Sequence, residues 1–120
     1  MCLMRSAVAL LAALIAYPAV AGSAANWKSG AQLPLARGEV TAARAGSEIF
    51  VVGGFAADGT NSARVDAYSP RRDSWRQIRD LPVTVDHAMS AAWRGKLYVA
   101  GGYAADRSRL TTLFTYANGS

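Results

Sequence analysis

Beyond residue 26, the hydrophobic positions fall into short segments that have the pattern of β-strands. Residues 48–53 form a near-continuous apolar run, which is typical of a strand covered on both faces. Residues 63–68 alternate, with Val65 and Ala67 on one face. Residues 39–45 and 75–78 have the composition of two further short strands, and Asp58-Gly59 and Ser69-Pro70 are turn signals between the segments.

The same pattern returns after 48 residues, with no insertion or deletion between the two copies. Residues 49–54 (Ile-Phe-Val-Val-Gly-Gly) return as residues 97–102 (Leu-Tyr-Val-Ala-Gly-Gly). The other recurring residues are Trp27 and Trp75, Leu33-Pro34 and Leu81-Pro82, Ala56-Ala57-Asp58 and Ala104-Ala105-Asp106, and Tyr68 and Tyr116. Four short strands in a repeat of this length predict one blade of a β-propeller.

The paired glycines and the tryptophan each have a physical role in such a blade. Gly53-Gly54 ends the most buried strand, where a residue without Cβ lets the backbone turn sharply or approach the next blade closely. Trp75 supplies the large apolar area that a thin sheet needs for packing on its neighbour. An ordinary hairpin turn also explains an isolated Gly-Gly, but it does not explain the recurrence in register.

The first twenty or so residues form a separate unit, as they have no β pattern. Residues 6–20 are almost wholly apolar after one positive charge at Arg5, and Ala19-Val20-Ala21 follows as an A-x-A site. This run is shorter than the roughly 20 residues that span a bilayer. The pattern predicts a signal peptide over residues 1–21, and therefore a protein exported to the periplasm or secreted. Cleavage after Ala24 or Ala25, an uncleaved anchor and a buried helix are the alternatives.

Composition narrows the chemistry further. The only cysteine, Cys2, lies in the predicted signal peptide, so the mature chain has no disulfide and no thiolate ligand. With one histidine as well, the sequence predicts neither a metal site nor a bound cofactor. The formal net charge is +5, but the basic residues are scattered and lack interleaved aromatics, which argues against nucleic-acid binding.

The repeated residues resemble the Kelch repeat, in which an aromatic-flanked strand ends in Gly-Gly and is followed by a Tyr and then a Trp. Arg37 also matches an arginine that often precedes the first strand of a Kelch blade, whereas the second copy has Val85 there and His87 two residues later. The resemblance covers residues 27–120 and implies an all-β fold of four-stranded antiparallel blades. The structural motif residues are Gly53, Gly54, Tyr68 and Trp75 in the first copy and Gly101, Gly102 and Tyr116 in the second.

Counting strands outward from the innermost one predicts an incomplete ring. Residues 26–32 align with a fourth strand and are predicted to close the ring, residues 35–82 form a full blade, and residues 83–120 form a second blade without its outer strand. Residues 47–53 and 95–101 should be central strands of adjacent sheets. We expect a truncated piece of a longer propeller with aggregation-prone edges; assembly of several copies into one ring is the competing interpretation.

The resemblance places any site on the loops at one face of the propeller. These are residues 55–62, 103–108, 33–38 and 80–87, and the candidate catalytic or sugar-contacting residues are Arg37, Glu39 and His87. His87 is a possible general base, although a structural histidine is the simpler interpretation. Because adjacent residues of a strand point to opposite faces, Asp86 is not expected to orient it. Asp58 and Asp106 are expected to bond their own turns.

Two functions remain open at this stage. The first is a module that binds a protein or a glycan on these loops, without nucleic acid and without a membrane after the signal is cleaved. The second is a fragment of a propeller enzyme acting on sugars, similar to a sialic-acid mutarotase or to galactose oxidase. The repeat and the signal alone do not choose between them, because a fold does not fix a function.

Overall fold

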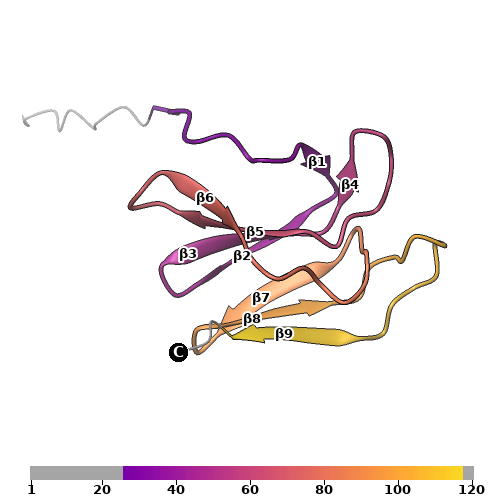
Figure 1. The fold of residues 1–120 in the computed structure, drawn as a ribbon. Helices are drawn as coiled ribbons and strands as arrows, with labels where there is room; N and C mark the ends of the chain where they lie inside the picture. Colours follow the sequence, from indigo (N-terminus) through magenta and orange to yellow (C-terminus); the bar gives the residue numbers. More distant parts are fainter. Residues whose placement is uncertain (1–25, 118–120) are drawn as a thin grey trace, which may run out of the picture.

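Two antiparallel sheets form the core of the molecule, and the described residues contain no helix (Figure 1). The structure is a computed structural model that describes residues 26–117. Its strands are β1 (Arg37–Gly38), β2 (Thr41–Ala45), β3 (Glu48–Val52), β4 (Phe55–Ala56), β5 (Val65–Ser69), β6 (Ser74–Gln77), β7 (Met89–Trp93), β8 (Lys96–Ala100) and β9 (Leu113–Ala117).

The first sheet is a complete four-stranded blade with the order β2-β3-β5-β6. Each strand pairs with the next along the chain, as in Ala43 with Phe50 and Tyr68 with Trp75. The innermost strand begins at Thr41, two residues after the predicted start at 39. Glu39 has a φ of 51°, in the left-handed region, and this breaks the extended conformation just before β2.

The second sheet repeats the first with the order β7-β8-β9. Its strands begin and end 48 residues after β2, β3 and β5, so the sequence repeat is a structural repeat. The strand β8 is central in this sheet, and β3 lies inside the first one. Both central strands are therefore as predicted for residues 47–53 and 95–101.

The hydrophobic core lies between the two sheets rather than within either one. It contains Ala45, Phe50, Val52, Val65 and Ala67 of the first blade and Val85, Ala88, Leu97 and Val99 of the second. The Phe50 ring contacts that of Tyr116 at 5.9 Å between centroids. A hydrogen bond of 2.7 Å between the hydroxyls of Thr41 and Ser90 joins the innermost strands. Each blade thus depends on its neighbour for burial.

Three glycines of the two Gly-Gly pairs lie close to another backbone segment, and Gly53 does so where the blades meet. Gly53 has a φ of 65°, and a Cβ there would stand 2.4 Å from the carbonyl oxygen of Val85. The Gly54 amide donates to that same carbonyl at 2.7 Å. In the second blade, a Cβ on Gly102 would stand 2.5 Å from the carbonyl oxygen of Asp86. Close backbone approach therefore explains the glycine at positions 53 and 102.

Residues 26–32 form no strand, and residues 26–30 are exposed (Figure 1). Trp27 is fully exposed. Contact with the first blade begins at Ala31, whose amide donates to Asp73 Oδ1 at 2.7 Å and whose carbonyl accepts from Trp75 Nε1 at 2.8 Å. The ring-closing role of this segment stays a prediction, since no strand of a further blade lies beside it here. The predicted signal peptide, residues 1–21, lies outside the described residues, as do residues 118–120 at the end of the second blade.

Candidate functional site at the loop end

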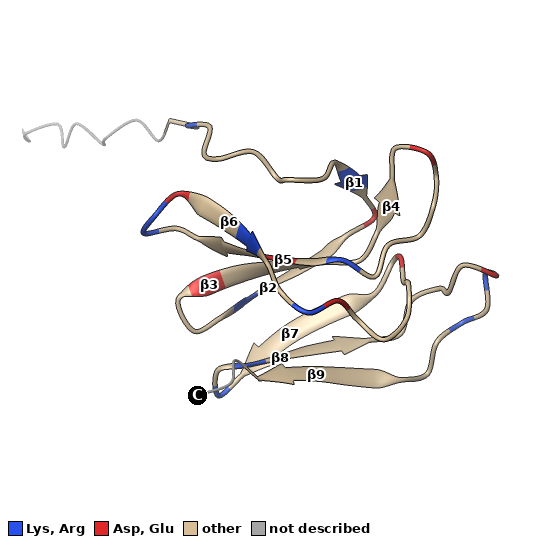
Figure 2. Ribbon diagram, viewed as in Figure 1, with Lys and Arg blue, Asp and Glu red and all other residues tan. Residues whose placement is uncertain are grey.

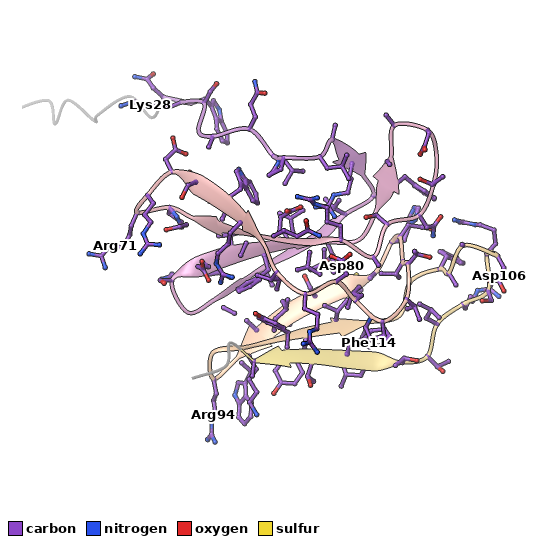
Figure 3. The ribbon with its side chains drawn as sticks, viewed as in Figure 1. Lys28, Arg71, Asp80, Arg94, Asp106 and Phe114 are labelled. Carbon is purple, nitrogen blue, oxygen red and sulfur yellow. The ribbon has the colours of Figure 1, made fainter. Side chains whose placement is uncertain are left out.

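The predicted face loops gather at one end of the two sheets, to the right in Figure 1. There β1 pairs with β4, joining residues 37–38 to 55–56. The corresponding positions of the second blade, Asp86 and Tyr103, pair in the same way. Figure 3 shows Asp106 at this end and Arg71 at the opposite end, in the turn before β6. The loops are thus held by backbone pairing to a rigid scaffold, as a binding site requires.

The centre of this end is the carboxylate of Asp86, which is fully buried. It accepts hydrogen bonds from Asn61 Nδ2 at 2.6 Å and from the Arg107 guanidinium at 3.0 Å, and it also contacts His87 Nδ1. Burial by itself raises the pKa of Asp86, but the bonds from His87 and Asn61 and the charge of Arg107 outweigh it. The pKa of Asp86 therefore lies below its ordinary value, and the carboxylate stays ionised.

The contact between Asp86 and His87 corrects the prediction that Asp86 would not orient His87. That prediction assumed an extended strand, in which adjacent side chains alternate between faces. His87 instead has a φ of 53°, and the strand β7 begins only at Met89. The left-handed turn brings the imidazole back over the carboxylate of the preceding residue.

His87 also contacts the first blade through its other ring nitrogen. Its Nε2 lies 3.2 Å from Oε2 of Glu39, and its amide donates to the Glu39 carbonyl at 3.2 Å. Glu39 and His87 occupy equivalent positions of the repeat, 48 residues apart, and both have left-handed backbones. Both side chains are about half exposed. Both ring nitrogens can donate to the two carboxylates together only while each carries a proton.

Two aromatic rings and one guanidinium border the imidazole. The rings of Phe55 and Tyr103 lie nearly perpendicular to that of His87, at 6.3 and 5.9 Å between centroids. Arg107 lies over the Tyr103 ring at 4.6 Å. Phe55 and Tyr103 are again equivalent positions of the repeat. We call Glu39, Phe55, Asn61, Asp86, His87, Tyr103 and Arg107 the loop-end cluster.

Arg37 does not belong to this cluster, although the sequence placed it with Glu39 and His87. Its side chain is fully buried and bonds Oδ2 of Asp66 at 2.6 Å and the carbonyls of Gly53 and Arg64. Burial lowers the pKa of Arg37, and the adjacent Asp66 acts in the opposite direction. Arg37 therefore links the loop before β2 to β5 and to the end of β3 inside the first blade, and its side chain is not accessible to a ligand in this structure.

Asn61, Tyr103 and Arg107 were not among the candidate site residues. The repeat held a signal for Tyr103, since it is the counterpart of Phe55 next to the Gly-Gly pair. Arg107 had none, because the equivalent residue in the first copy is Gly59. The predicted turn roles of Asp58 and Asp106 are confirmed: Asp58 Oδ1 accepts from the Thr60 amide at 3.0 Å and Asp106 Oδ1 from the Ser108 amide at 2.9 Å.

The distribution of charged and metal-ligating side chains in the described part of the chain is as follows. Figure 2 shows the acidic and basic residues mostly on loops and turns, with the sheets largely free of them. Within residues 26–117, no three His, Cys, Asp or Glu side chains come together as a metal ligand set. In the same range, no helix has the length and apolar character to cross a bilayer.

Comparison with known proteins agrees with the fold. A family model described as "Kelch motif" matches residues 36–82. Among the similar solved structures is one titled "Structure of YjhT", with a TM-score of 0.60 and 25% sequence identity. The match covers 68% of this chain and 25% of that one, so the chain spans about a quarter of the length of this structural relative. No curated protein matches the chain. Residues 36–82 are therefore a Kelch motif, and the two sheets are adjacent blades of a Kelch-type β-propeller in an open, incomplete ring.

Proposed function

We propose that this chain is an exported Kelch-type module that binds a glycan or a protein on the loop-end cluster, and that a glycan is the better fit. The observation that supports this is the set of half-exposed Glu39, His87 and Arg107 side chains near Phe55 and Tyr103. His87 and Arg107 both contact the buried Asp86, and Glu39 lies beside His87. Such a set combines a carboxylate acceptor, guanidinium donors and apolar ring surface.

A sugar needs these three features together. Its hydroxyl groups donate to carboxylates and accept from guanidinium N–H groups. Its C–H faces pack against aromatic rings, which supply apolar area at low conformational cost. The Asp86 contacts hold His87 and Arg107 in place before a ligand arrives, which reduces the entropy lost on binding. The repeat also presents Glu39 with His87 and Phe55 with Tyr103 as neighbouring pairs, so that a multi-ring ligand can contact both blades.

The test is glycan binding by the purified chain, on a glycan array followed by calorimetry with the best ligand. Arg107→Ala should weaken binding at least tenfold, because it removes an exposed donor from the cluster. Arg71→Ala is the matched control, since it removes the same side chain from the opposite end of the sheets (Figure 3). Equal affinity of both variants, or no glycan bound by the parent chain, would contradict the proposal.

A second candidate function is catalysis on a sugar, with proton transfer through His87. The observation that favours it is the series of contacts from Asp86 through the His87 ring to Glu39, in which one carboxylate orients the imidazole and the other faces solvent. A mutarotase-like reaction needs such a group to move a proton between the anomeric hydroxyl and the ring oxygen.

Polarimetry of freshly dissolved sugar anomers distinguishes the two functions. If His87 transfers the proton, His87→Gln should abolish acceleration of anomer exchange even at sugar concentrations that saturate the variant, as calorimetry of the same variant establishes. A parent chain that binds sugar without accelerating exchange is a binding module. Export is tested separately, by sequencing the amino terminus of the protein recovered from the medium or periplasm; an intact Met1 there contradicts cleavage after Ala21.

A further inference from the structure

The outer face of the second blade exposes residues whose counterparts in the first blade are buried. Trp93 is 61% exposed and Leu113 is 59% exposed, whereas the equivalent Ala45 and Val65 are 8% and 3% exposed. The first blade buries these positions because the second blade packs on them. The second blade therefore presents a packing face of the same kind, to which Met89 adds a third exposed apolar side chain.

The strand β9 has a neighbour on one edge only among the described residues, since the second sheet ends with it. In the first blade, the equivalent edge of β5 carries β6, which spans Ser74–Gln77. Residues 26–29 (Asn-Trp-Lys-Ser) are the 48-residue counterpart of that strand, and they lie exposed and unpaired. Within residues 26–117, the segment 26–29 is thus an unpaired counterpart of a fourth strand, and the second sheet has three strands.

A crevice of about 170 Å³ lies between the two blades along β9. It is lined by Val52, Val65 and Ile78 to Pro82 from the first blade and its connection, and by Leu97, Val99 and Phe114 to Tyr116 from the second. In the first blade, Trp75 contacts two of the equivalent positions, Tyr68 and Ala31. Its ring packs on Tyr68 at 4.9 Å, and its Nε1 donates to the carbonyl of Ala31. Tyr116 and Arg79 are the counterparts of Tyr68 and Ala31. The crevice is therefore the place that an indole occupies in the complete blade.

We propose that copies of this chain assemble head to tail, and that residues 26–29 of one copy add to β9 of the next as its missing fourth strand. The register follows from the first blade: Trp27 lies opposite Tyr116 and Lys28 opposite Thr115, as Trp75 lies opposite Tyr68 and Arg76 opposite Ala67. The indole of Trp27 enters the crevice and donates to the carbonyl of Arg79. The face of Trp93 and Leu113 packs on the partly exposed Ile49 and Val51 of the incoming copy.

A second copy of the chain is the occupant that fits. Its residues 26–29 can pair with β9 while its Ile49 and Val51 cover Trp93 and Leu113, in the same arrangement that the two blades have within one copy. An unrelated partner would have to match the crevice, the strand edge and the apolar face independently. The contact is heterologous, so that it produces a closed ring where the rotation per copy divides a full turn, and an open fibre where it does not. Either product buries the exposed tryptophans and pairs the free strand edges.

Light scattering and native mass spectrometry of the purified chain test the assembly. The parent chain should form an oligomer with a β-sheet spectrum, and Trp27→Ala should raise the dissociation constant at least tenfold. Trp27 is fully exposed within one copy, so this change does not disturb the fold of the monomer. Trp27→Phe should keep most of the assembly, and Arg71→Ala should keep all of it. A folded monomeric parent, unfolded aggregates, or equal assembly of Trp27→Ala and the parent overturns the proposal.

Cysteine pairing tests the register directly. In a Cys2→Ser background, Lys28→Cys mixed with Thr115→Cys should give an intermolecular disulfide on mild oxidation. Lys28→Cys mixed with Arg71→Cys is the control, because Arg71 lies in a turn away from β9 (Figure 3). Equal yields of the two disulfides would show that the contact is random. If a longer chain carrying further blades fills the β9 edge itself, the matched disulfide disappears in that chain, and the edge belongs to those blades rather than to a second copy.

Discussion

At the scale of single residues, close backbone approach explains the glycines at positions 53, 54 and 102. Gly46 and Gly53 have almost the same φ, 63° and 65°, but differ in their surroundings. A Cβ on Gly46 would meet nothing within 4 Å, whereas one on Gly53 would stand 2.4 Å from the Val85 carbonyl oxygen. Alanine at Gly46 therefore measures the cost of the left-handed backbone alone, and alanine at Gly53 measures that cost together with the cost of the blade contact.

The prediction is that Gly53→Ala destabilises the fold more than Gly46→Ala does. The left-handed conformation costs an alanine about 1–2 kcal/mol at either position. At Gly53 the blades must also separate, so a further cost of about 1–3 kcal/mol is expected. Urea unfolding followed by circular dichroism measures both variants. Equal midpoints would show that the blades yield freely at this contact.

The buried ion pair of the first blade is the other feature that distinguishes the two copies at this scale. Arg37 and Asp66 are fully buried together, and Arg64 bonds the second oxygen of Asp66 at 2.8 Å. The second blade has Val85 and Phe114 at the positions of Arg37 and Asp66. The same fold thus accepts either a charged or an apolar pair at these positions.

Asp66→Ala should therefore cost about 3–5 kcal/mol, because it leaves a buried guanidinium without its partner. The double change Arg37→Val with Asp66→Phe copies the second blade and should cost less than the single change. Thermal unfolding of the parent and both variants tests this order. A double variant less stable than Asp66→Ala would mean that the Arg37–Asp66 pair stabilises the fold beyond avoiding an unpaired buried charge.

At the scale of elements, the repeat predicted the strands well and the loops poorly. The strands follow from apolar runs and alternation, which the 48-residue repeat states twice. The contact of Asp86 with His87 could not be predicted, because it depends on the left-handed backbone of a histidine. Arg107 was missed because it reaches the site from a loop position that is glycine in the other copy. Position alone also did not show that the Arg37 side chain turns inward to Asp66.

The loop end should also make the fold sensitive to acid. The pKa of Asp86 is lowered by the hydrogen bonds from His87 and Asn61 against the opposing effect of burial, and side-chain and backbone bonds lower those of Asp58 and Asp106. A carboxyl whose pKa is lower in the folded chain stabilises it fully above the unfolded value, near 3.8. That contribution is lost as the pH falls through the folded pKa.

We therefore expect that titration of these carboxyls changes the free energy of unfolding little above about pH 5. Below about pH 4, the free energy of unfolding should decline as they are protonated. Urea unfolding at a series of pH values measures the curve. Asp86→Asn should be less stable at neutral pH and should show a shallower acid decline. An acid decline as steep as that of the parent would remove Asp86 from its causes.

At the scale of the whole molecule, the position of the core makes the two blades one cooperative unit. Neither sheet has an interior of its own, since the buried side chains of one blade contact those of the other. Leu97 of β8 is 2% exposed and lies in this shared core.

Leu97→Ala should cost about 2–5 kcal/mol of the free energy of unfolding. Because the loss falls on the interface, the amides of β3 in the first blade should lose protection from hydrogen exchange together with those of β8. Trp93→Ala removes a larger side chain from the exposed face and should leave that protection unchanged in the monomer. If β3 keeps its protection in Leu97→Ala, each blade folds by itself, and the dependence of one blade on the next, from which the assembly is inferred, does not hold.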